Sequence, residues 1–117
     1  MIRMTLTACL VGLPAVAGDV EIVDARARAG TAGWSFDVTL RHGDTGWDHY
    51  ADAWRIVGPD GTVYGTRTLY HPHVEEQPFT RSLSGVVIPD DVASVEVEAH
   101  DKVHGWAGTR LKIDLSR

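Results

Sequence analysis

Apolar and polar residues alternate one by one from residue 34 to residue 42, and this pattern constrains the fold more than any other feature of the sequence. The apolar positions are Trp34, Phe36, Val38 and Leu40, and the positions between them are Ser35, Asp37, Thr39 and Arg41. Successive side chains of an extended strand point to opposite faces. The segment is therefore predicted to be a β-strand with one buried face.

Similar strand signals recur along the chain at short and regular spacing. We expect strands at residues 20–28, 34–42, 50–57, 62–71, 79–88, 95–104 and 111–115. Turn residues separate them, most clearly in Gly58-Pro59-Asp60-Gly61, where proline presets φ and glycine accepts a positive φ. No segment is convincingly helical. The prediction is an all-β fold, a seven-stranded antiparallel sandwich of two sheets.

The chain resembles fibronectin type III and immunoglobulin-like domains over essentially all of residues 20–115. The likeness is carried by Ile88-Pro89, by the following Val95-Glu96-Val97-Glu98-Ala99, and by Gly105-Trp106-Ala107-Gly108, which is expected to be a loop. The resemblance implies that Trp54, on the third strand, is packed between the sheets. Residues 71–81 also resemble a segment of small exported bacterial proteins, a likeness that implies no particular activity.

The first residues predict an export signal. Arg3 precedes an apolar run at residues 6–13, and the small residues of Ala15-Val16-Ala17 fit a cleavage site. We expect a cleaved signal peptide at residues 1–17 and one β-sandwich domain at residues 18–117, periplasmic or secreted. The alternative is a lipoprotein signal ending at Cys9, although little apolar sequence precedes that residue. The run is too short to span a bilayer comfortably, so no membrane span is expected.

Loss of this peptide would remove the single cysteine and both methionines of the chain. The domain would then fold without a disulfide, on the strength of its core alone. Without thiolate or thioether donors, a blue-copper centre is excluded and a Cu(I) thioether site is not expected. The 16 acidic and 11 basic residues are scattered, so no basic surface for nucleic acid is predicted.

The six histidines lie near the connections that should share one end of the sandwich. In an antiparallel sandwich with short connections, successive loops alternate between the two ends. Residues 42–49, 71–78 and 100–108 should therefore lie together, and the turn at 58–61 should lie at the other end. These segments contain His42, His49, His71, His73, His100 and His104. Because imidazole is the commonest protein metal ligand, this end is the candidate functional site.

His71-Pro72-His73 is the sharpest element of the group, because extended residues two apart point to the same side and both rings could meet one ion. We expect His71, His73, His104 and His49 to be the main ligands, with His100 and His42 as further candidates. His42 shares the parity of buried residues on its strand, so a buried neutral histidine is an alternative there. Imidazole and carboxylate donors suit Zn(II) or Cu(II).

Trp47, Trp106 and Glu75 are further candidates for contact with a ligand. Alternatively, the two indoles cover the end of the core, and the carboxylates of Asp44 and Glu75 are solvated loop charges. No catalytic motif is found, which favours a binding protein over an enzyme. Two functions stay open. One is binding of a divalent transition metal, or of a metallated or anionic ligand; the other is metal-free binding of an exported protein or a glycan by the same loops.

Overall fold

The computed structural model describes residues 19–116, so the expected signal peptide at residues 1–17 lies outside the described residues. The strands are β2 (Glu21–Gly30), β3 (Gly33–Arg41), β4 (Ala51–Val57), β5 (Val63–Thr68), β6 (Phe79–Val86), β7 (Ser94–Asp101), β8 (Gly105–Trp106) and β9 (Leu111–Asp114). In this part of the chain, no helix has the length and apolar character needed to cross a membrane.

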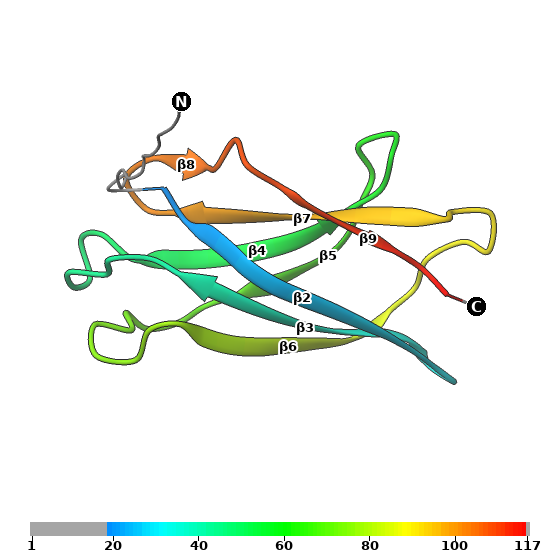
Figure 1. The fold of residues 1–117 in the computed structure, drawn as a ribbon, viewed down its shortest axis with the longest axis horizontal. Coiled ribbons are helices and arrows are strands. Elements are labelled where there is room, and N and C mark those ends of the chain that lie inside the picture. Colours follow the sequence, from blue (N-terminus) through cyan, green and yellow to red (C-terminus); the bar gives the residue numbers. More distant parts are fainter. Residues whose placement is uncertain (1–18, 117) are drawn as a thin grey trace, which may run out of the picture.

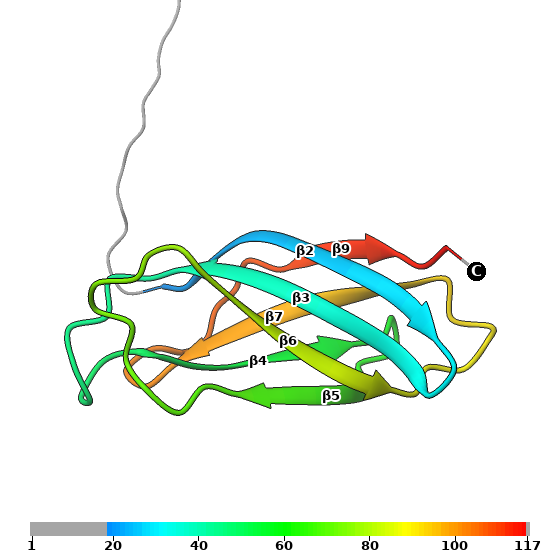
Figure 2. The ribbon, with the colours of Figure 1, turned by 90° about the horizontal axis from the view of Figure 1, so that it is seen from below.

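Two antiparallel sheets face each other, and the prediction of an all-β sandwich is confirmed (Figures 1 and 2). One sheet has the order β2-β3-β6, and the other has the order β5-β4-β7-β8, with β9 also paired to β7. Consecutive strands pair within each sheet, as β2 does with β3 and β4 with β5, and the chain changes sheet after β3, β5 and β6.

The prediction of a loop at residues 105–108 is wrong in part, because Gly105–Trp106 forms strand β8. The described residues therefore form eight strands, and not the seven that were predicted. Gly105 has a φ of 78°, which lets the chain reverse immediately after β7. β8 pairs with His100 and Asp101, and β9 pairs with residues 94–97 of the same strand. β8 and β9 are therefore two pieces of one final strand that runs along the edge of β7.

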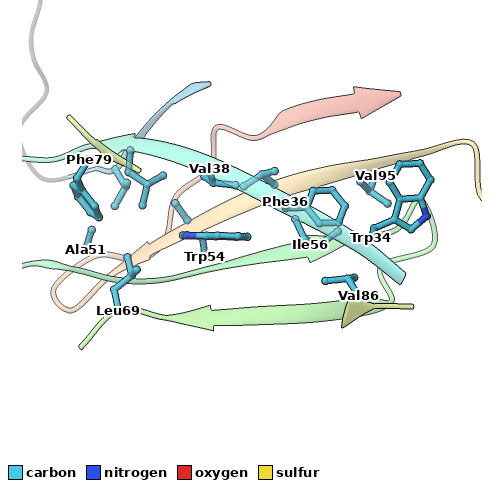
Figure 3. Close-up of a cluster of buried hydrophobic side chains, with 14 of the residues drawn as sticks. Trp34, Phe36, Val38, Ala51, Trp54, Ile56, Leu69, Phe79, Val86 and Val95 are labelled. Carbon is cyan, nitrogen blue, oxygen red and sulfur yellow. The ribbon is translucent and has the colours of Figure 1, made fainter. Parts of the chain in front are cut away.

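Alternate side chains of β3 fill the space between the sheets, as the sequence pattern predicts. Trp34, Phe36, Val38 and Leu40 are all buried. They pack with side chains of β4 and β7, among which the indole of Trp54 lies fully buried near the middle of the core (Figure 3). The predicted packing of Trp54 between the sheets is confirmed.

Strand register brings the three histidine-bearing connections to one end. Leu40 is the Cα partner of Phe79, so the end of β3 lies beside the start of β6. Ala51 is the partner of Asp101, so the start of β4 lies beside the end of β7. Figure 1 shows these connections at the left end, with the β4–β5 turn at the right. The predicted arrangement of loops is confirmed.

Candidate metal centre

His42 is buried at the end of β3, because it continues the inward parity of that strand. Its Nδ1 donates a hydrogen bond of 2.5 Å to Oδ1 of Asp44. This bond leaves Nε2 on the far side of the ring, where it lies 3.9 Å from Oδ2 of Asp101. The expectation that His42 is buried is confirmed, and its ring is oriented so that Nε2 faces a second carboxylate.

Asp44 holds the loop after β3 together from within. Its Oδ1 also accepts a hydrogen bond of 3.0 Å from the backbone N–H of Ala51, and its Oδ2 accepts one of 2.7 Å from the N–H of His73. One carboxylate therefore joins the β3–β4 connection, the start of β4 and the β5–β6 connection. The interpretation of Asp44 as a solvated loop charge is wrong, because its side chain is fully buried.

Asp101 ends β7 with its side chain fully buried between the sheets. Its Oδ1 accepts hydrogen bonds from the backbone N–H groups of Val103 at 2.9 Å and His104 at 2.8 Å, and Nδ1 of His104 lies 3.1 Å away. Burial raises the pKa of Asp101, but these hydrogen bonds outweigh it and hold that pKa below its usual value. Oδ2 has no hydrogen-bond partner.

His49 completes the group from the β3–β4 connection. Its Nε2 lies 3.3 Å from Oδ1 of Asp101, yet this buried nitrogen makes no hydrogen bond. The centroid of its ring is 4.8 Å from that of His42 and 5.1 Å from that of His104. Three rings from two connections therefore gather around the carboxylate of Asp101.

Two sets of donor atoms result within residues 19–116. In each set, one donor atom per residue lies within 4.8 Å of the others; the first set is His42, His49 and Asp101, and the second is Asp19, Asp101 and His104. Donors bound to a tetrahedral ion at about 2.1 Å are separated by roughly 3.4 Å. The distances of 3.3 and 3.9 Å within the first set are close to that separation.

The His71-Pro72-His73 pair belongs to neither of these sets. His71 is exposed, whereas the ring of His73 is stacked on Phe79 with centroids 3.9 Å apart. Arg81 Nη2 donates a 2.9 Å hydrogen bond to Nε2 of His73. Burial and the adjacent charge of Arg81 both lower the pKa of His73. The contacts with Phe79 and Arg81 give His73 a role in packing. Joint binding of one ion by His71 and His73 stays a prediction.

His100 points away from the donor sets, because side chains alternate along β7 and Asp101 points inward. Its Nδ1 lies 2.5 Å from Oδ1 of Asp52, and its ring contacts the edge of Trp106. The ring of Trp106 also covers the guanidinium of Arg55, with Cζ 3.8 Å from the ring centroid. His100 and Trp106 thus belong to a polar surface of the larger sheet.

Trp47 and Glu75 are exposed at the loop end, and 63% of Trp47 is open to solvent. The indole of Trp47 contacts the ring of Tyr50 edge-on, with centroids 5.7 Å apart. Trp47 therefore does not serve as a lid over the core, which was the alternative for this residue.

Asp101 and Asp19 were not among the donors expected from the sequence. Asp101 carried a usable signal, because it has the parity of the buried residues Val95, Val97 and Ala99. A carboxylate at an inward position of a strand needs a compensating partner. Asp19 lies before β2 and carried no comparable signal.

Comparison with known proteins identifies a relative of this chain. The chain is 37% identical over 97 residues to a protein of Halomicrobium mukohataei named "Putative lipoprotein", and the match covers 82% of this chain and 47% of that protein. The chain thus spans about half the length of this relative. No family model and no solved structure matches the chain.

Proposed function

We propose that this protein binds a divalent transition metal ion through Nε2 of His42, Nε2 of His49 and the carboxylate of Asp101. The observation that carries the proposal is a pair of orphaned atoms. Nε2 of His49 and Oδ2 of Asp101 are buried without hydrogen-bond partners. A buried polar atom without a partner costs about 1–3 kcal/mol. A metal ion at this position would satisfy both atoms at once.

The charges around the site also favour a cation. Asp44 and Asp101 are buried, and the ion pairs that the structure shows for them are all with histidines. Buried carboxylates require a compensating positive charge. A divalent ion supplies that charge while leaving the imidazoles neutral, which is the form that binds metals.

Asp44 would orient His42 as a ligand. A carboxylate that accepts a hydrogen bond from one ring nitrogen fixes the tautomer, so that the other nitrogen carries the lone pair that a metal ion can bind. Two imidazoles and one carboxylate suit Zn(II) or Cu(II), with water or another side chain as a further ligand. The rival function, metal-free binding of a protein or glycan by the same loops, would use the exposed ring of Trp47 or Trp106.

We propose further that the domain is exported and related to the immunoglobulin-like and fibronectin type III sandwiches. Residues 1–17 fit an export signal, and the relative's name, "Putative lipoprotein", agrees with export. The first, second and fifth strands share one sheet, and the third, sixth and last share the other, as in the immunoglobulin arrangement.

Titration of the metal-free protein with Zn(II) or Cu(II) tests the metal site. We expect saturable binding tighter than about 10 μM, a free energy of roughly 7 kcal/mol. His49→Gln should weaken binding at least tenfold. Glu76→Gln is the matched control, because Glu76 is exposed at the same end and lies outside both donor sets, and this variant should bind as the wild type does. Wild-type affinity in His49→Gln would overturn the proposal.

A further inference from the structure

We infer that this end of the sandwich holds two metal ions bridged by Asp101. The inner ion is the one proposed above, bound by His42 and His49. The outer ion binds Nδ1 of His104 and the carboxylate of Asp19. The inference rests on the proposed function, because the two sets of donors share Asp101.

The donors form two separate sets because of their spacing. His104 and Asp19 do not extend the first set; they join Asp101 in a second one. A single ion with bonds of about 2.1 Å holds even opposite ligands only about 4.2 Å apart. Atoms that cannot be gathered within 4.8 Å therefore do not surround one ion. Two positions on either side of a shared carboxylate accommodate all five residues.

The two oxygens of Asp101 face different rings, His42 at Oδ2 and His104 at Oδ1, while Nε2 of His49 lies between the two positions, 3.3 Å from Oδ1. Oδ2 is the orphaned oxygen, and it lies on the side of His42 Nε2 at 3.9 Å. Oδ1 lies 3.1 Å from Nδ1 of His104, a separation that an ion bound to both atoms would also produce. Each oxygen can thus bind one ion, which is the arrangement of carboxylate-bridged centres with ions about 3.5–4 Å apart.

The two positions differ in depth. The side chains of His42 and Asp101 are 1% and 0% exposed, so the inner ion would be largely shielded from water. The side chain of His104 is 40% exposed and Asp19 is exposed, so the outer ion would keep bound waters. The inner ion should therefore bind more tightly and exchange more slowly than the outer one.

The charges around the two positions accommodate a second cation. Asp19, Asp44 and Asp101 contribute three negative charges around neutral imidazoles, when all three are ionised. One divalent ion leaves an excess of one negative charge, whereas two leave an excess of one positive charge that bound hydroxide or an anion can neutralise. A single ion therefore leaves one uncompensated negative charge, which attracts a further cation.

The test is the number of Zn(II) ions bound, measured by elemental analysis and calorimetric titration of the whole protein. We expect two equivalents in the wild type and in the control Glu76→Gln, and one in His104→Gln. Asp19→Asn should weaken the second equivalent at least tenfold. Circular dichroism should show that these exposed substitutions leave the fold intact. With two equivalents of Cu(II), magnetic coupling should depress the electron paramagnetic resonance signal, and His104→Gln should give an uncoupled spectrum.

The possible failures can be told apart. One equivalent in both the wild type and His104→Gln would overturn the second ion and leave the inner site standing. Two equivalents in His104→Gln would place the second ion elsewhere and would also overturn this inference. No saturable binding in the wild type would instead remove the proposed function itself.

Discussion

Replacing Asp44 by asparagine should destabilise the metal-free protein more than any other isosteric change at the loop end. The carboxylate accepts three hydrogen bonds, two at Oδ1 from His42 and Ala51 and one at Oδ2 from His73. An amide has one oxygen and one NH₂ group. In its better orientation, the amide oxygen keeps the two bonds at Oδ1, and the NH₂ group faces the N–H of His73.

The magnitude follows from these bonds. A buried N–H without an acceptor costs about 1–3 kcal/mol, and the two remaining bonds lose the strengthening that an ionised acceptor provides. We therefore expect a loss of about 2–4 kcal/mol. This is a large part of the 5–15 kcal/mol typical of whole domains.

Urea denaturation in the presence of a chelator measures this loss, with circular dichroism as the signal. Glu75→Gln is the matched control, because it makes the same chemical change at an exposed position of the same end and should stay within about 0.5 kcal/mol of the wild type. A loss below 1 kcal/mol for Asp44→Asn would refute the view that its carboxylate holds the connections together.

Three further results are expected. Trp54→Ala should lower the free energy of unfolding by about 3–5 kcal/mol, because the indole of Trp54 is fully buried. Trp106 lies on β8 and is 37% exposed, so Trp106→Ala should lower it by less than about 1.5 kcal/mol. Equal losses for the two variants in denaturant melts would contradict this expectation. Since the pKa of His73 is lowered from 6.5, the neutral ring is favoured by folding, so its contribution is complete above pH 6.5 and declines as the pH falls through the lowered pKa. The free energy of unfolding, measured with chelator as a function of pH, should therefore fall less steeply below pH 6.5 for His73→Gln than for the wild type. Parallel curves for the two proteins would argue against this role of His73. Finally, Zn(II) at a hundred times its dissociation constant should stabilise the protein by about 2.7 kcal/mol, which a chelator should reverse; an unchanged melting temperature would count against the site.

The class of fold could be predicted from the sequence because it depends on the local alternation of apolar and polar residues. The inward parity of Trp34, Phe36, Val38 and Leu40 becomes the buried face of β3 without change. Residues with such a period bury one face of a strand whatever their partner strands are. Strand β8 was not predicted because a segment of two residues is too short to show a period, and only its pairing with β7 makes it a strand.

The location of the candidate site was also contained in the sequence, since alternating loops place the histidine-bearing connections at one end. The membership of the two donor sets could not be predicted from the sequence. Their centre is Asp101, and both His42 and His49 are more than fifty residues away from it in the chain. His49 approaches Asp101 through the pairing of β4 with β7, and His42 approaches it because the two sheets pack face to face. The sequence by itself therefore determined the class of fold and the end that carries the histidines. Only the tertiary structure decided which side chains meet, because contacts between strands depend on register and burial, which no local pattern specifies.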